Sequence, residues 1–214
     1  MKSTNIGEQF DKKAADWDAS ERRVALAAAI TAAMERELAE KPGCRLLDYG
    51  AGTGLCSLAL APRCASVLAM DVSAGMLAKL NEKAIASGIA NLETLRHDLS
   101  EAPLNGQCFD AILCAMTLHH VRDVPLLLSR FRELLSPGGF LAIADLDKED
   151  GTFHDDPTGV EHNGFVRGDI TRRLAEAGFS FTEIQTVHEI RKPHGDKERV
   201  YPVFFATGRM AVPS

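Results

Sequence analysis

Short apolar runs alternate with helix-forming segments along most of this chain, and this alternation restricts the fold more than any other feature. The apolar runs begin near residues 45, 66, 92, 109 and 140. Most of the intervals between them are rich in helix-forming residues, at 55–63, 74–88 and 125–136. Apolar runs without strict polar alternation are typical of parallel strands buried on both faces. The sequence therefore predicts an open, doubly wound α/β sheet with helices on both faces.

Both ends of the chain depart from this rhythm. The segment from Ser20 to Ala39 predicts a helix before the first strand, with Ser20 as its N-cap. The strand-like runs at 181–192 and 199–210 are separated only by the turn-forming PHGDKE. This pattern predicts a hairpin at the sheet edge with an antiparallel last strand. The one long segment without periodicity covers residues 148–166, and such a loop is usually functional or disordered.

The composition disfavours several classes of partner. The chain has 214 residues, a formal net charge of −6 and no long run of Lys or Arg, which argues against binding to nucleic acid. Its five cysteines show no C-x-x-C spacing and indicate reduced thiols. The N-terminal residues lack an apolar signal core, and no stretch approaches the ~20 apolar residues that cross a bilayer. We therefore expect a single cytoplasmic domain over residues 1–214, without membrane insertion.

Glycines and acids gather where the predicted strands end. The first strand runs into RLLDYGAGTGL, which places Gly50, Gly52 and Gly54 in the turn before a helix. Such a turn lets backbone N–H groups approach a ligand, although glycines that only allow tight packing would give the same pattern. Three acids end successive strands at the carboxyl edge, where open α/β sheets bind ligands: Asp48, Asp71 and Asp98.

The spacing of these glycines separates two adenosine cofactors. Dinucleotide-binding domains use G-x-G-x-x-G to place a pyrophosphate at a helix N-terminus. Here the spacing is G-x-G-x-G, and an acid precedes it by two residues. S-adenosylmethionine has no phosphate but carries a cationic sulfonium and an amino group, for which Asp48 is a better neighbour. Asp71 lies about 20 residues further on, where an acid can bind the ribose hydroxyls.

Five motifs, in order and spacing, resemble those of the class I S-adenosylmethionine-dependent methyltransferases. They are LLDYGAGTG, VLAMDVSAGML, RHDLSEAP, FDAILCAMTLHHV and LLSPGGFLAIADL. The closest resemblance is to the small-molecule group that includes ubiquinone and menaquinone methyltransferases. It implies a Rossmann-like, mostly parallel seven-stranded sheet with an antiparallel last strand, S-adenosylmethionine as cofactor, and transfer of its methyl group by in-line displacement.

The resemblance also assigns residues to the cofactor. It places Gly50 and Gly52 against the methionine and ribose part, Asp48 near the amino group and Asp71 at the ribose hydroxyls. Around the adenine and the methionine amino group it places Val72, Met76, Asp98, Leu99 and the backbone carbonyl of Cys114. Residues 1–40 would form an N-terminal helical lid, with Trp17 where the family usually has Tyr, and residues 148–166 would cover the acceptor.

The catalytic residues stay open at this level. Methyl transfer needs alignment and exclusion of water, and it needs a base only when the acceptor is protonated. His119 and His120 follow the fourth strand, and His162 lies in the long loop, so these are the candidate bases. The loop also carries His154 and several acids that could bind a divalent cation, although no ligand spacing is visible.

A small organic acceptor is the working hypothesis. No Asn/Asp-Pro-Pro-Tyr follows the fourth strand, where the superfamily places it for methylation of amino groups on nucleobases or amides; CAMTLHH stands there instead. Two other readings fit parts of the pattern. A regulatory protein that binds S-adenosylmethionine without turnover would show the same motifs. A nicotinamide-dependent oxidoreductase is a weaker alternative, which tighter binding of a dinucleotide than of the sulfonium cofactor would favour.

Overall fold

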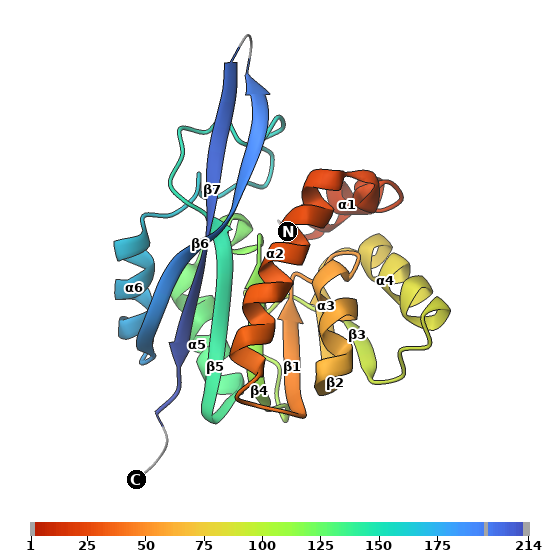
Figure 1. Cartoon of the computed structure of the whole chain (residues 1–214). Helices are drawn as coiled ribbons and strands as arrows, with labels where there is room; N and C mark the ends of the chain where they lie inside the picture. Colours follow the sequence, from red (N-terminus) through yellow and green to blue (C-terminus); the bar gives the residue numbers. More distant parts are fainter. Residues whose placement is uncertain (1–2, 195–196, 212–214) are drawn as a thin grey trace.

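A seven-stranded sheet forms the centre of the molecule in the computed structural model, which describes residues 3–194 and 197–211. The spatial order of the strands is β3-β2-β1-β4-β5-β7-β6 (Figure 1). All neighbouring pairs are parallel except those made by β7, which runs antiparallel to both β5 and β6. The strands are β1 (Cys44–Tyr49), β2 (Cys64–Asp71), β3 (Leu92–Arg96), β4 (Phe109–Ala115), β5 (Leu135–Leu146), β6 (Ser180–His194) and β7 (Lys197–Arg209).

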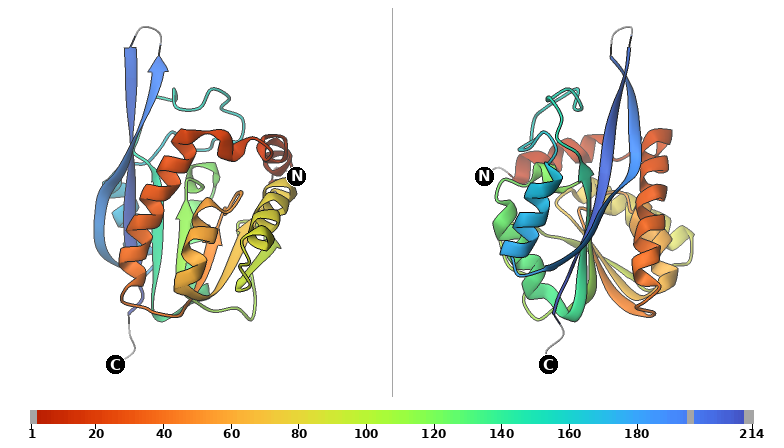
Figure 2. Two further views of the ribbon diagram at one scale, coloured as in Figure 1. Left: turned by 45° about the vertical axis from the view of Figure 1, so that its right-hand side comes forward. Right: turned by 60° about the vertical axis from the view of Figure 1, so that its left-hand side comes forward.

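Helices cover both faces of this sheet (Figure 2). On one face lie α2 (Glu21–Leu38), α3 (Leu55–Leu60) and α4 (Ala74–Ala86). The other face carries α5 (Val124–Leu134) and α6 (Arg167–Glu176). The remaining helix, α1 (Ser3–Lys13), crosses the carboxyl edge of the strands, and short 3-10 turns occupy Trp17–Ala19, Ala61–Arg63 and Leu118–His120. The predicted doubly wound sheet with an antiparallel last strand is confirmed.

Neighbouring side chains on the central strands point into different layers of the core. Leu47 and Ile112 pack in the cluster under α5 and α6, whereas Leu46 and Leu113 pack in the cluster under α2 and α3. All four side chains are fully buried. A strand buried on both faces needs apolar residues at every position, which explains why the runs lack alternation.

The helix predicted over residues 55–63 ends earlier in the structure. Regular α-helix stops at Leu60, and residues 61–63 form a 3-10 turn. Pro62 has no N–H to donate, and its ring clashes with the carbonyl four residues before it. The other predicted helices differ from the structure by at most two residues at either end, within the usual disagreement over helix ends.

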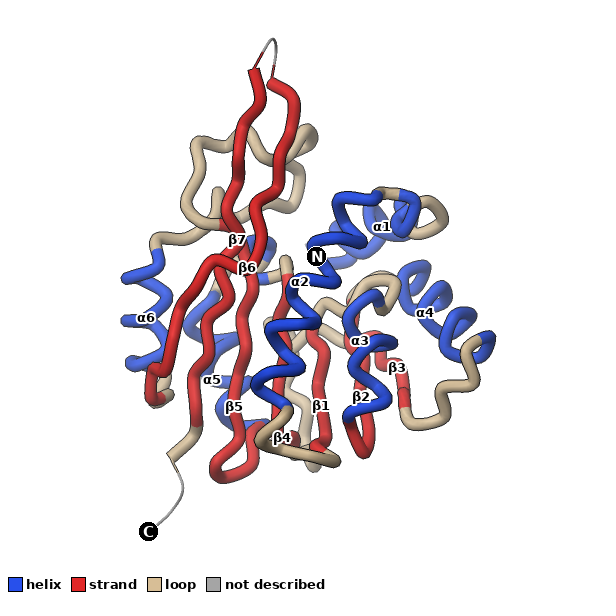
Figure 3. The backbone as a smooth tube through the Cα atoms, in the orientation of Figure 1, coloured by secondary structure: helices blue, strands red, loops and turns tan. Residues whose placement is uncertain are grey.

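The hairpin of β6 and β7 rises well beyond the carboxyl edge of the sheet, beside the loop that follows β5 (Figure 3). Its strands pair as far as His194 and Lys197, and the centre of the predicted turn, residues 195–196, lies outside the described residues. The hairpin, this loop and α1 therefore surround the same edge. Among the described residues, no helix combines the length and apolar character needed to cross a bilayer.

Candidate functional site

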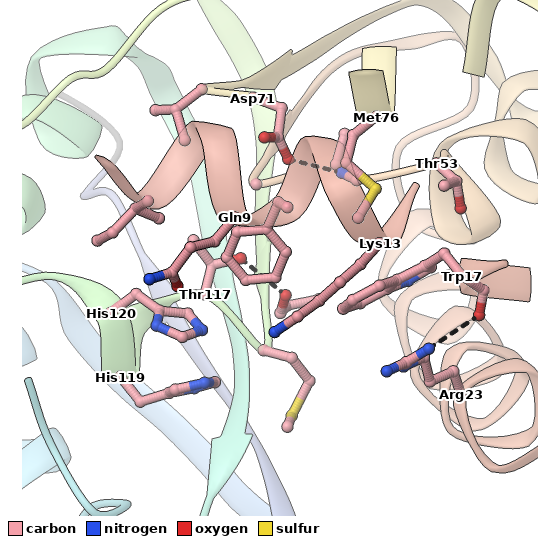
Figure 4. A pocket seen from close by; sticks show the side chains of 18 of the residues that line it. Gln9, Lys13, Trp17, Arg23, Thr53, Asp71, Met76, Thr117, His119 and His120 are labelled. Atoms are coloured by element: carbon pink, nitrogen blue, oxygen red, sulfur yellow. Dashed lines mark hydrogen bonds between the residues drawn. The ribbon is translucent and has the colours of Figure 1, made fainter. Parts of the chain in front are cut away.

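A cavity of about 720 Å³ lies at the carboxyl edge of the parallel strands, beneath α1 (Figure 4). This volume falls within the range of ~300–1,000 Å³ that is usual for small-molecule sites. Its wall combines N-terminal residues between 6 and 30, the ends of β1, β2 and β4, the loop after β5, and β6. Parts of the chain far apart in sequence therefore meet at one site, as expected at the switch point of an open α/β sheet.

The glycine turn after β1 forms the floor of this cavity. Gly50 has φ +76°, and a Cβ there would lie 2.1 Å from the Thr117 hydroxyl oxygen, so its small size is required by packing against the β4 loop. Gly52 has φ +55°, but nothing lies within 4 Å of where its Cβ would be. Both glycines line the cavity, and the open space beside Gly52 leaves room for a ligand close to the backbone.

Asp48, at the end of β1, is a buried acid on the cavity wall. Its side chain is 2% exposed, and its Oδ2 accepts a hydrogen bond from the Ser57 hydroxyl of α3. Burial raises the pKa of Asp48 to about 6, although the Ser57 hydrogen bond acts in the opposite direction. A cationic group bound in the cavity would favour the charged carboxylate.

Asp71 ends β2 and is held by backbone groups on both sides. Its Oδ2 accepts from the Gly52 N–H at 2.8 Å, and its Oδ1 accepts from the Ser73 N–H at 2.8 Å. Burial raises the pKa of Asp71, and these N–H groups partly oppose that shift. The carboxylate is therefore fixed in orientation against the glycine turn. Val72 and Met76 line the cavity next to it.

The third predicted acid, Asp98, also lies on the wall. Its Oδ1 accepts from the Tyr49 hydroxyl at 3.1 Å and from the backbone N–H and hydroxyl of Ser100. Leu99 and Cys114 are not lining residues, because both are fully buried in the core behind the wall. At the position predicted for Cys114, the cavity is lined by Ala115 of the same strand.

The N-terminal segment places Trp17 over the cavity, as Figure 4 shows. The Arg23 guanidinium lies 3.9 Å from the Trp17 ring centroid and donates to the Trp17 carbonyl oxygen at 3.3 Å. Phe10 packs edge-on against the same ring, with centroids 5.7 Å apart. These contacts hold the tryptophan ring by its face and edge.

Two acids fasten this N-terminal segment to the sheet side of the cavity. The Oδ1 atom of Asp11 accepts from the Ser73 hydroxyl and, at 2.7 Å, from the Gly75 N–H at the start of α4. Asp18 accepts from the Thr53 hydroxyl at 2.6 Å and forms an ion pair with Lys83. We call these contacts the Asp11 latch and the Asp18 latch.

His119 is the histidine best placed for proton transfer. It lies in the 3-10 turn after β4, lines the cavity and is 2% exposed. Its Nδ1 donates to Oδ1 of the fully buried Asp145 at 2.8 Å, because an ionised carboxylate can only accept. Asp145 also accepts from the backbone N–H groups of His119 and Leu146. This hydrogen bond leaves Nε2 of His119 as the ring nitrogen with a lone pair.

The other predicted bases are less suited to that role. His120 lines the cavity, but burial lowers its pKa to about 3, and its Nδ1 donates to the Gly159 carbonyl. His162 is not a lining residue, contrary to its place among the candidate bases. Its Nε2 donates to the Val121 carbonyl at 2.9 Å and its ring packs on Phe165, so it holds the loop in place.

The acids of the loop after β5 are dispersed among separate partners. Asp147 is bound by Arg167, Asp155 by Lys192, and Glu161 by Arg122. Across residues 3–194 and 197–211 there is no group of three or more His, Cys, Asp or Glu side chains arranged to hold a metal ion.

Among the residues whose roles sequence reasoning missed are Lys13 and Asp145. Lys13 reaches into the cavity from the end of α1, and Asp145 supports His119. Asp145 gave a usable signal, since an acid inside the apolar run FLAIADL must find a partner when the strand is buried. Lys13 gave none, because its direction depends on how α1 crosses the sheet.

Comparisons with known proteins agree with this geometry. The family model described as "Methyltransferase domain" matches residues 47–143. An uncharacterized methyltransferase of Schizosaccharomyces pombe is 33% identical over 160 residues, covering 68% of this chain and 56% of that protein. A ubiquinone biosynthesis O-methyltransferase of Xylella fastidiosa is 32% identical over 123 residues, covering 56% of this chain and 49% of that protein.

The fold extends over nearly the whole chain. The crystal structure of a SAM-dependent methyltransferase from Aquifex aeolicus superimposes with a TM-score of 0.72 at 23% identity, covering 94% of this chain and 98% of that one. At this identity the superposition shows a shared fold. By contrast, the chain spans about half the length of the curated relatives it matches.

Proposed function

Since this chain belongs to the class I S-adenosylmethionine-dependent methyltransferase family, we propose that it transfers a methyl group to a small organic acceptor. The cofactor is S-adenosylmethionine. When bound, it supplies a methyl group on a sulfonium that leaves as a neutral thioether once an acceptor atom attacks the methyl carbon. The observation that carries the proposal is the cavity that joins Asp48, Asp71 and the glycine turn to His119.

The residues of the cavity fit this cofactor. Asp48 is a buried carboxylate whose pKa is raised to about 6 by burial, with the Asp71 charge acting in the same direction, so it suits the cationic amino group. Asp71 is fixed by backbone donors, which leaves it oriented to accept from ribose hydroxyls. The open space at Gly52 supports an approach close to the backbone. Asp98, Val72 and Met76 would surround the adenine.

We propose that two segments around the cavity each cover a different ligand, one the cofactor and the other the methyl acceptor. Residues 1–40 act as a lid on the cofactor side, with Trp17 and the two latches as its contacts. Residues 148–166 contribute Phe153, His154 and several polar residues to the opposite wall, which supports their role as a cover for the acceptor. Both segments then belong to one domain over residues 1–214.

His119 acts as the general base in this proposal. Its Nδ1 hydrogen bond to Asp145 holds the ring with Nε2 free to take a proton, and the buried carboxylate stabilises the imidazolium that results. An acceptor hydroxyl next to Nε2 would lose its proton to that nitrogen as its oxygen bonds to the methyl carbon, whereas an ammonium group would have to lose a proton to Nε2 before its nitrogen could attack.

The test follows labelled methyl groups. Purified protein is incubated with methyl-labelled S-adenosylmethionine and the small-molecule fraction of a cell extract. We expect label in small molecules, and a rate about 10²–10³-fold lower for His119→Gln. Binding of S-adenosylhomocysteine should be unchanged in that variant. His162→Gln is the matched control, since its amide can still donate to Val121 and the residue lies off the cavity wall.

If label stays on the cofactor although the protein binds it, the chain is a regulatory binding protein and the proposal is wrong. If both histidine variants transfer label at the wild-type rate, the role of His119 is wrong.

A further inference from the structure

Aromatic rings crowd the part of the cavity around His119, which we call the acceptor end. The rings of Phe10 and His120 meet edge-on with centroids 5.4 Å apart. Those of Phe153 and His154 meet edge-on at 4.8 Å, and His154 lies 5.0 Å from His119. All five residues line the cavity. Walls of this kind suit a flat acceptor.

Positive charge also gathers at the acceptor end. Lys13 extends from α1 across the cavity towards His119 and His120 (Figure 4), and it forms no ion pair within the described part of the chain. Its Nζ is 5.6 Å from the Phe10 ring centroid. Lys192 approaches from β6, where its Nζ lies 5.1 Å from the Phe153 ring centroid.

Among the described residues, the nearby carboxylates of the loop form no ion pair with Lys13. Asp155 accepts from Lys192 at 3.2 Å and its side chain is 94% exposed. Asp156 accepts from the backbone N–H and hydroxyl of Thr158 within the loop. Within residues 3–194 and 197–211, the Lys13 ammonium therefore faces the cavity without an ion-pair partner, although its charge helps to lower the pKa of Asp156.

His154 adds an unsatisfied polar atom to the same place. Its Nε2 is buried and has no hydrogen-bond partner among the described residues. Burial lowers the pKa of His154 to about 4, and the charges of Lys192 and Lys13 act in the same direction, whereas Asp145 opposes the shift. The ring is therefore neutral at physiological pH and has two lysine ammonium groups in its surroundings. A buried unpaired polar atom is costly unless a ligand satisfies it.

We propose that the methyl acceptor is an aromatic acid whose anionic oxygens bind Lys13 Nζ and the neighbouring His154 ring. The flat body of the acid packs between Phe10 and Phe153, and its ionisable methyl-accepting group faces His119. This inference rests on the proposed function and names the substrate class of the same site. A carboxylate and a phosphate share the required chemistry.

The test uses the fluorescence of Trp17, the only tryptophan of the chain, which lines the cavity. Protein saturated with S-adenosylhomocysteine is titrated with 4-hydroxybenzoate, with its uncharged analogue 4-hydroxybenzamide, and with phenyl phosphate. We expect at least one of the two acids to bind about tenfold or more tightly than the amide. Their relative affinities identify the preferred anionic group.

Lysine variants show where the acid binds. Lys13→Met should remove the preference for the acid over the amide, and Lys13→Arg should restore it. Lys12→Met is the matched control, because this substitution removes the same charge from the same helix. Lys12 is exposed and does not line the cavity. Equal binding of acids and amide, binding of none of them, or equal effects of the two Met variants would overturn the inference. Failure of the wild-type protein to bind S-adenosylhomocysteine would instead overturn the proposed function.

Discussion

Asp48 is in an unfavourable state when its carboxylate is charged and no cation is nearby. It is almost fully buried, and its hydrogen-bond donors are the hydroxyl and the backbone N–H of Ser57. Its raised pKa means that the folded protein binds a proton there more tightly than the unfolded chain does. The protonated Asp48 carboxyl therefore contributes stability that is fully present below pH ~4 and is lost as the pH rises through about 6.

This predicts a pH-dependent effect of Asp48→Asn on the ligand-free protein. At pH 7.5 the variant should be more stable than the wild type by up to about 3 kcal/mol, because it removes a buried charge. At pH 4 the difference should nearly vanish, since the wild-type carboxyl is then protonated. Urea unfolding at both pH values measures it. A stability difference that does not change with pH would contradict the role given to burial.

At the residue scale, the sequence was informative wherever position along a strand determines function. Asp48, Asp71 and Asp98 were predicted to meet at one edge, and all three line the cavity. The choice among the histidines was not predictable in this way. His119 is distinguished from its neighbour His120 by a contact with Asp145, which is 26 residues away in the chain.

At the scale of elements, the Asp11 latch joins α1 to α4. Ser73 caps α4 through its own hydroxyl, which accepts from the Met76 N–H, so the helix keeps its cap without Asp11. Asp11 instead binds Ser73 and Gly75 from outside the helix. Loss of the Asp11 side chain should therefore release α1 from the start of α4 without unfolding α4.

We therefore expect Asp11→Ala to speed dissociation of S-adenosylhomocysteine about fivefold, the effect of losing roughly one capping interaction. The melting temperature should change little. Asp16→Ala is the matched control, because Asp16 is exposed on the same segment. Stopped-flow measurement of Trp17 fluorescence gives the rate. Equal rates for both variants would show that the latch does not hold the lid.

The elements themselves were largely predictable, because each is encoded by local residues. Apolar runs predicted the strands, and Ser20 predicted the start of α2 at Glu21. The separate helix α1 was not distinguished within the expected lid. Its position depends on contacts to Ser73 and Gly75, more than 60 residues away, which no local pattern encodes.

At the scale of the whole molecule, both halves of the site lie at the same edge of the sheet. In our proposal the cofactor binds at the ends of β1 and β2, whereas the acceptor end is formed by the turn after β4, α1, the loop after β5, and β6. The first half follows from the strand order and was predicted. The second half depends on how the hairpin and the long loop fold over the edge, so Lys13, Lys192, Phe10 and Phe153 emerged only from the structure, whereas its histidines were already candidates from the sequence.

The central claim is that this edge binds S-adenosylmethionine, and calorimetric titration tests it most directly. Wild-type protein and Asp71→Ala are titrated with S-adenosylmethionine, S-adenosylhomocysteine and NAD. We predict that the wild type binds the first two and not NAD, and that Asp71→Ala weakens binding about 10–100-fold through loss of charged hydrogen bonds. Tighter binding of NAD, or unchanged affinity in the variant, would contradict the account.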